Sequence, residues 1–148
     1  MKIYLDNCCY NRPYDDQSQM RIHLESLAKL HIQQKIVSGE YEMVWSYVLD
    51  YENSKNPFVI KREAIYEFST NMAKYVGIEN SGTAGNLAKD IEATGVKSKD
   101  ALHVACALIA GCDYFLTTDD RLLKHKSDKL RIISPTQFIN ETEGNFDD

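Results

Sequence analysis

The sequence KSKDALHVACALIAGCDYFLTTDDR, residues 97–121, decides the fold of this chain. Its first half has a mostly apolar helix pattern that begins near Asp100 and ends at Gly111. A short apolar segment, residues 114–116, follows as a predicted buried strand and leads to Asp119. A helix that begins with an acid and a strand that ends with one can place two carboxylates at one edge of a parallel sheet. In open α/β sheets, ligand sites lie at that edge.

The remaining sequence alternates between strand and helix patterns, which favours an α/β fold: a three-layer α/β/α domain with a mostly parallel central sheet. Further strands are expected at residues 2–5, 41–45 and 130–133, while residues 74–78 are either a strand or a turn. A loop is expected at residues 7–17, and helices at about 19–38, 47–52, 58–71, 81–94, 121–126 and 135–140. In the first of these helices, Leu24, Leu27, Leu30 and Ile36 form an incomplete apolar stripe, from which we expect one buried face. Ser98 can cap the helix that begins near Asp100, while Gly39 and Gly95 are expected to end the helices that precede them. We expect one domain over residues 1–140 and an acidic, flexible tail over residues 141–148.

Length, charge and cysteine usage narrow the class of protein. The 148 residues suffice for one domain, and no apolar run approaches the ~20 residues that span a bilayer. The N-terminal sequence lacks the apolar segment of a signal peptide, which indicates a cytoplasmic protein. The net charge of −5 argues against a broad basic surface for nucleic acid, although a cation held by carboxylates can meet a phosphate locally.

The four cysteines form no CxxC pair, so we expect reduced thiols in the core.

Four acids from distant parts of the sequence fall near predicted strand ends: Asp6, Glu52, Asp100 and Asp119. Each one alone has an ordinary explanation as a turn former, a helix cap or a solvated side chain. Brought together, two unit charges ~4 Å apart repel by ~4 kcal/mol at an effective dielectric constant of ~20. Converging carboxylates therefore need protons or a hard cation such as Mg²⁺ or Mn²⁺. Such a cation activates water and polarises phosphate, which indicates phosphodiester hydrolysis.

These residues resemble the PIN-domain family, metal-dependent nucleases that include the VapC-like toxin ribonucleases. In that family the first strand ends in Asp, as Ile3-Tyr4-Leu5-Asp6 does here. A Ser after the second strand is followed six residues later by an acid. Ser46 and Glu52 have this spacing, and we therefore prefer Glu52 to Asp50.

The C-terminal half carries the more specific part of the resemblance. Residues 100–107 fit the family pattern Asp-Ala-x-x-x-Ala-x-Ala, and Leu116-Thr117-Thr118-Asp119 is similar to its acidic strand end. One departure is Asn7-Cys8-Cys9, where the family usually places a Ser or Thr close after the first Asp. Hydroxyl support for the first acid is therefore not expected from the residues directly after it.

The resemblance implies that Asp6, Glu52, Asp100 and Asp119 are catalytic, metal-binding acids with Mg²⁺ or Mn²⁺ as cofactor. It implies single-stranded or structured RNA as substrate, cut by metal-activated water without a covalent intermediate. It also implies a homodimer and, for a toxin, a small antitoxin protein as partner. The alternative is a catalytically inactive PIN-like domain that binds RNA or a protein.

Several neighbouring residues have two interpretations, and no role is assigned to Asp120. His103 lies one helical turn after Asp100, either near the metal or packed in the core. Arg12 either contacts a phosphate or neutralises the acids at 15 and 16. Basic residues that either meet phosphates or form a solvated face are Lys97, Lys99, Arg121, Lys124 and Lys126. Aromatic residues that can stack on bases, although packing explains most of them better, are Tyr10, Tyr14, Trp45 and Tyr47.

Overall fold

A five-stranded parallel sheet forms the centre of the molecule, in a computed structural model that describes residues 1–144. The strands, in chain order, are β1 (Lys2–Leu5), β2 (Glu42–Ser46), β3 (Ala73–Val76), β4 (Tyr114–Leu116) and β5 (Arg131–Ile133). Their spatial order is β3-β2-β1-β4-β5, and every neighbouring pair is parallel. The predicted α/β class is confirmed, and the doubtful segment after residue 73 is an edge strand.

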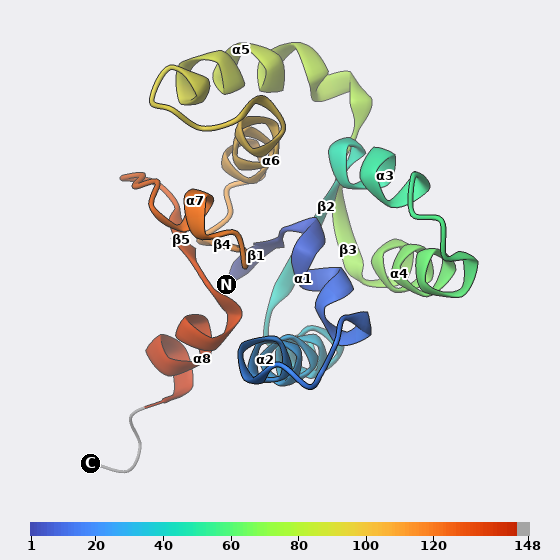
Figure 1. Ribbon diagram of the computed structural model, residues 1–148. Helices are drawn as coiled ribbons and strands as arrows, with labels where there is room; N and C mark the ends of the chain where they lie inside the picture. The colour runs from blue at the N-terminus through green and yellow to red at the C-terminus, as the bar shows by residue number, and fades with distance from the viewer. Residues whose placement is uncertain (145–148) are drawn as a thin grey trace.

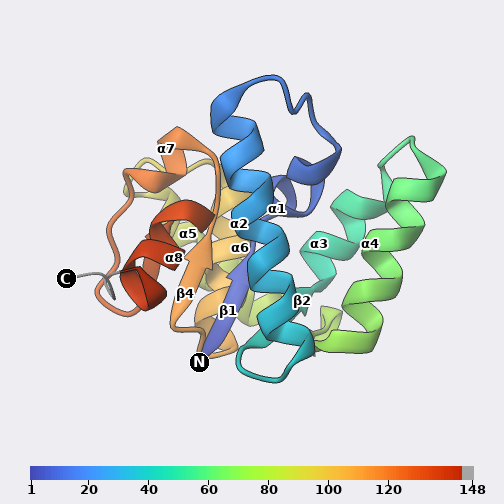
Figure 2. The same cartoon turned by 90° about the horizontal axis from the view of Figure 1, so that it is seen from below.

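Helices cover both faces of this sheet and so give the three layers that the alternating pattern predicts. The longer helices are α2 (Met20–Val37), α3 (Tyr47–Ser54), α4 (Val59–Met72), α5 (Ser81–Glu92), α6 (Ser98–Ile109) and α8 (Pro135–Glu143). The shorter ones are α1 (Asn7–Asn11), η1 (Arg12–Tyr14), η2 (Ile78–Asn80) and α7 (Asp120–Leu123). Figure 1 shows α5 and α6 on one face of the sheet and α2 and α8 on the other. Figure 2 shows α3 and α4 side by side as a helical hairpin next to α2.

The chain changes its direction of travel across the sheet between β1 and β4. From β1 it continues to β2 and β3 on one side, and later to β4 and β5 on the other. Strands β1 and β4 are nevertheless neighbours, with Leu5 opposite Leu116. Both strands are buried, and the Tyr4 and Phe115 rings stack with centroids 5.1 Å apart. The carboxyl ends of two adjacent strands therefore meet at the point where α/β sheets usually bind ligands.

Two predictions about the first fifty residues are wrong. Residues 7–14 are helical rather than a loop, because the Asp6 carboxylate caps α1 by accepting the backbone N–H of Asn7 at 2.8 Å. The expected apolar face of α2 is also wrong, since Leu24, Leu27 and Leu30 are about half exposed. The helix instead buries a face that is partly polar, which consists of Glu25, Ser26, Ala28, Lys29, Ile32 and Ile36.

Helix ends follow the predicted glycines more closely than the predicted caps. Gly39, Gly95 and Gly111 adopt positive φ angles of 86°, 104° and 72°, a conformation that residues with a Cβ rarely take. Ser98 is not the cap of α6, because it is already the first helical residue and Lys97 precedes it without a capping side chain.

The C-terminal helix is longer than predicted. It ends at Glu143 rather than near Asn140, since Glu143 forms a 2.9 Å ion pair with His31 and Glu141 pairs with Arg131. The last four residues of the predicted acidic tail, 145–148, lie outside the described residues.

Two expectations from composition can be compared with the structure. Within residues 1–144, no helix has both the length and the apolar character needed to cross a bilayer. All four cysteines are free thiols, and Cys9, Cys106 and Cys112 are buried as expected. Cys8 is only partly buried, because it lies at the carboxyl end of the sheet beside Asp6.

Candidate metal site

Asp6 is held firmly at the carboxyl end of β1. Its backbone N–H donates to the carbonyl of Leu116 at 2.9 Å, which ties it to β4. Its Oδ1 accepts from the N–H of Asn7, while its Oδ2 accepts from the Thr117 hydroxyl at 2.8 Å. The side chain is almost buried, with 7% of the residue exposed. Asn7, Cys8 and Cys9, which follow Asp6, carry no hydroxyl group, and Thr117 instead donates the hydroxyl hydrogen bond to the Asp6 carboxylate.

Glu52 reaches the same site from α3. This helix begins after Ser46, whose Oγ caps it by accepting the N–H of Leu49 at 3.2 Å. The Glu52 carboxylate is hydrogen-bonded to His103 Nε2 and lies 3.6 Å from Lys99 Nζ. Burial by itself would raise the pKa of Glu52, but the hydrogen bond and charge of His103, together with Lys99, lower it.

His103 connects Glu52 to a chain of buried polar groups. This arrangement decides between the two interpretations of His103 that the sequence left open. It is 1% exposed, and its Nδ1 lies 2.6 Å from the Tyr4 hydroxyl, which in turn lies 2.7 Å from Ser46 Oγ. His103 Nε2 is also 3.9 Å from Asp6 Oδ1. His103 is therefore both packed and adjacent to the acids.

Asp100 lies in the first turn of α6 and is half-buried. Burial raises its pKa, and the negative charges of Asp6, Asp119 and Glu52 raise it further, while His103 opposes them. Because such charge effects fall off with distance, Asp100 lies near enough to the other three acids to feel their charges.

Asp119 contributes from the end of β4, where it is exposed. Its Oδ1 accepts the N–H of Arg121 at 2.9 Å and so caps α7. Its own N–H donates to the Thr117 hydroxyl at 3.1 Å. The same Thr117 hydroxyl therefore contacts both Asp6 and the backbone of Asp119.

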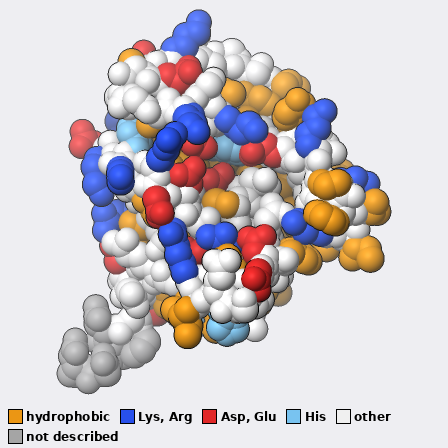
Figure 3. All heavy atoms as spheres, in the orientation of Figure 1, with side chains coloured by type: hydrophobic (Ala, Val, Ile, Leu, Met, Phe, Trp, Pro, Cys, Tyr) orange, Lys and Arg blue, Asp and Glu red, His pale blue; other side chains and the backbone are white. Residues whose placement is uncertain are grey.

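The donor atoms fit a hard divalent cation. One ligand atom from each of Asp6, Glu52 and His103 lies within 4.8 Å of the other two. Asp100 and Asp119 are outside this tight group, although the charge of Asp119 raises the pKa of Asp100. Carboxylate oxygens are preferred ligands of Mg²⁺ and Mn²⁺, and a cation would relieve the repulsion among these acids. Figure 3 shows acidic side chains gathered near the middle of one face with basic side chains around them.

Other candidate residues have structural partners. Arg12 pairs with Glu25 at 2.8 Å and with Asp15 at 3.3 Å, so it neutralises acids of its own region. Asp120, which the sequence left without a role, pairs with Arg21 at 2.9 Å. Of the four aromatic residues, Tyr10 and Trp45 are buried, Tyr47 is partly buried and Tyr14 is half exposed.

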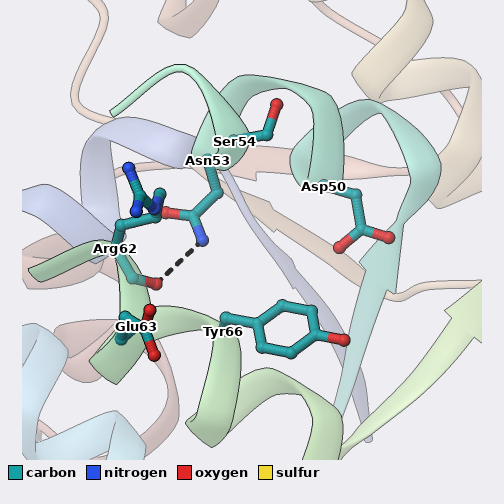
Figure 4. Close-up of a pocket in the computed structure, with 6 residues that line it drawn as sticks. All are labelled: Asp50, Asn53, Ser54, Arg62, Glu63 and Tyr66. Atoms are coloured by element: carbon teal, nitrogen blue, oxygen red, sulfur yellow. Dashed lines mark hydrogen bonds between the residues drawn. The ribbon is translucent and has the colours of Figure 1, made fainter. Parts of the chain in front are cut away.

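Asp50, the acid that the motif spacing disfavoured, lies in a different place. Its carboxylate accepts hydrogen bonds from the Trp45 indole N–H at 2.6 Å and from the Tyr75 hydroxyl at 2.5 Å. It lines a pocket of about 490 Å³ between α3 and α4, where Tyr66 extends toward it (Figure 4). Asp50 and Glu52 thus belong to two separate sites.

Comparison of the sequence with protein-family models and with curated proteins finds no match. Among solved structures, this chain is similar to a chain of VapBC2 from Rickettsia felis, a crystal structure bound to a DNA fragment from the promoter of the pair. The TM-score is 0.54 with 13% sequence identity, and the alignment covers 89% of this chain and 97% of the other. This likeness, together with the all-parallel sheet, confirms the predicted PIN-like α/β/α fold.

Proposed function

We propose that this chain is a Mg²⁺- or Mn²⁺-dependent ribonuclease that hydrolyses phosphodiester bonds with metal-activated water. The predicted catalytic and metal-binding residues are Asp6, Glu52, Asp100 and Asp119. The observation that carries the proposal is the group of ligand atoms from Asp6, Glu52 and His103 within 4.8 Å of one another, with Asp100 near enough for the neighbouring acids to raise its pKa. So many carboxylates in one half-buried site cost stability, which makes a cation-binding role a better explanation than a structural one.

The residues of the chain have separable tasks in this proposal. When bound, the metal ion supplies a water of lowered pKa and charge stabilisation for the phosphate oxygens. Asp6 is fixed by Thr117 and by the N–H of Asn7, so its carboxylate is oriented before any ligand binds. The hydrogen bond to His103 and the nearby Lys99 lower the pKa of Glu52 and so favour its charged form. Preorganised charges of this kind are usually the largest contribution to catalysis.

We also propose that the chain is the toxin of a toxin–antitoxin pair in the cytoplasm, restrained by a small antitoxin protein and able to form a homodimer. The support is the fold likeness to a chain of VapBC2, which is a complex. Co-expression with candidate partners encoded nearby, followed by co-purification and a cleavage assay, tests this part of the proposal independently.

The decisive experiment is cleavage of a mixed-sequence single-stranded RNA by the purified protein in Mn²⁺ and in EDTA. We expect metal-dependent cleavage that falls by ~10²–10³ in rate for Asp100→Asn, the usual cost of losing one well-placed electrostatic group. Asp113→Asn is the matched control, because Asp113 precedes β4 at the opposite edge of the sheet, where its carboxylate accepts the backbone N–H of Lys2 at 2.9 Å. The control should retain the wild-type rate.

Two other results would change the conclusion. Equal cleavage by wild type and Asp100→Asn would show a contaminating nuclease and remove Asp100 from the mechanism. Binding of Mn²⁺ and RNA without cleavage would select the alternative, an inactive PIN-like domain that binds RNA or a protein partner.

A further inference from the structure

A basic pocket lies directly beside the four acids. It has a volume of about 240 Å³ and is formed by the α5–α6 connection and by α7. Asp100 forms part of its wall, so the pocket and the acidic site share one residue. The remaining lining includes the cationic side chains of Lys97, Arg121 and Lys124, together with His125.

The three cationic side chains are not used inside the protein. Across the described residues 1–144, ion pairs engage Arg12, Arg21 and Lys99, whereas Lys97, Arg121 and Lys124 form none. All three side chains are exposed. Lys97 lies in the α5–α6 connection, whereas Arg121 and Lys124 lie in and directly after α7, at least 24 positions later in the sequence. Because like charges repel, a cluster of three cations that form no ion pair among the described residues is explained best by an external anion.

We infer that this pocket binds a backbone phosphate of the RNA strand, next to the phosphate that is cleaved. This inference rests on the proposed function, since it names a subsite for the same substrate. The volume is below the roughly 300–1,000 Å³ of pockets that enclose larger ligands, and so it suits a phosphate group better than a whole nucleotide. Arg is well suited to this role, since its planar guanidinium can bind phosphate oxygens in a bidentate manner.

The pocket also gives the bound strand a direction across the protein. On the other side of the acids, the pocket between α3 and α4 is lined by two acids and one cation, Asp50, Glu63 and Arg62, so its charge favours phosphate less than the basic pocket does. In Figure 3, basic side chains surround the acidic centre, while hydrophobic ones gather on the side of α4. The strand therefore passes from the acids toward α7 rather than toward α4.

The test compares two double variants that each remove two positive charges. Arg121→Gln with Lys124→Gln removes charge from the pocket. Lys74→Gln with Lys129→Gln is the matched control. Lys74 lies on β3, the edge strand far from the pocket, and Lys129 lies just before the amino end of β5, whereas the acids lie at the carboxyl ends of the strands. All four side chains are exposed, so thermal melting should confirm that both variants fold like the wild type.

The primary measurement is binding of a fluorescein-labelled 20-nucleotide single-stranded RNA by anisotropy over a series of salt concentrations. Binding is measured in Ca²⁺, with RNA integrity checked on denaturing gels. Losing one phosphate contact should reduce the slope of log K against log salt by roughly 0.7. We expect this reduction for the pocket variant alone, and recovery of the slope when Arg121→Lys is combined with Lys124→Arg, which preserves both charges.

The outcomes separate this inference from the proposed function. An equal change of the salt slope in both double variants, or no change in either, would overturn the inference that the pocket binds phosphate. RNA binding by the wild type that does not depend on salt would overturn it as well. Because this measurement needs no cleavage, it remains decisive if the Asp100→Asn assay fails. If cleavage is observed, the pocket variant should raise KM several-fold with little change in kcat, and an unchanged KM would count against the pocket.

Discussion

The hydroxyl of Thr117 connects two acids that follow neighbouring strands. It donates to Asp6 Oδ2 and accepts the N–H of Asp119, and the residue is fully buried. Since bulk water does not reach it, this hydroxyl orients Asp6 together with the backbone N–H of Asn7. Residues that orient metal ligands in this way commonly contribute 10–100-fold to metal affinity or activity.

We therefore predict that Thr117→Val lowers Mn²⁺ affinity by about 10–100-fold in a calorimetric titration. The change preserves shape but leaves Asp6 Oδ2 with only the weaker Cys8 thiol donor at 3.6 Å, so the free energy of unfolding should also fall by about 1–3 kcal/mol. Thr118→Val is the matched control, because Thr118 is also buried but its N–H contacts Cys8 Sγ at 3.3 Å. Equal losses of affinity in the two variants would rule out an orienting role for Thr117.

At this scale the positions of Asp6 and Asp119 after strands could be predicted from the sequence, while their supporting residues could not. Asp6 and Asp119 directly follow apolar strand patterns, and those patterns are local. The bond between Thr117 and Asp6 spans 111 residues, and the one between Tyr4 and His103 spans 99. Such pairings depend on strand order and side-chain packing, which local periodicity does not encode.

At the scale of elements, Ser46 couples the sheet to the helix that carries Glu52. Its Oγ caps α3 and also bonds the Tyr4 hydroxyl. We predict that Ser46→Ala costs about 1 kcal/mol of stability in urea unfolding. It should also weaken Mn²⁺ binding, because the first turn of α3 and the Tyr4–His103 pair lose a shared partner.

Ser134 gives a matched control for this prediction. It caps α8 through the same kind of bond, from the N–H of Gln137 at 3.1 Å, but it follows β5 rather than a strand next to Glu52. Ser134→Ala should cost a similar amount of stability and leave Mn²⁺ affinity unchanged. If both variants bind Mn²⁺ like the wild type, Ser46 is only a helix cap.

The elements themselves were predictable where apolar residues mark the buried face. Strand β4 and helix α6 are apolar over most of their length, and both were found from the sequence. Helix α1 was missed because its five residues carry no helical period and its start depends on the Asp6 cap. The face of α2 was wrong because Glu25 is buried in ion pairs with Arg12 and Arg21, where a pattern search expects apolar side chains.

At the scale of the whole molecule, the sheet order determines where charge accumulates. The sequence predicted parallel strands and convergent acids, but it did not give the order β3-β2-β1-β4-β5. That order makes β1 and β4 neighbours and so brings Asp6 close to Asp119 and Asp100. Without a cation, the folded state keeps these charges together, whereas the unfolded chain separates them. The acidic centre should therefore destabilise the metal-free protein and make its stability depend on metal.

Thermal melting should show this dependence directly. At a Mn²⁺ concentration of 100 Kd, binding to the folded state alone adds ≈ 2.7 kcal/mol. For a chain of this length, we expect the melting temperature to rise by roughly 5–10 °C. Asp100→Asn should melt higher than the wild type in EDTA, since it removes one repelling carboxylate, and should gain less from Mn²⁺. The control Asp113→Asn should respond to Mn²⁺ like the wild type.

The pH dependence of this difference follows from the raised pKa of Asp100. Between its ordinary value of 3.8 and the raised value, the folded state binds more protons than the unfolded state, so stability falls as pH rises. In EDTA, the advantage of Asp100→Asn should therefore be complete at pH 7 and disappear as pH falls toward 3.8. Melting curves across this range provide the measurement. An advantage that persists unchanged at low pH would mean that Asn packs better at this position, and that charge repulsion is not the cause.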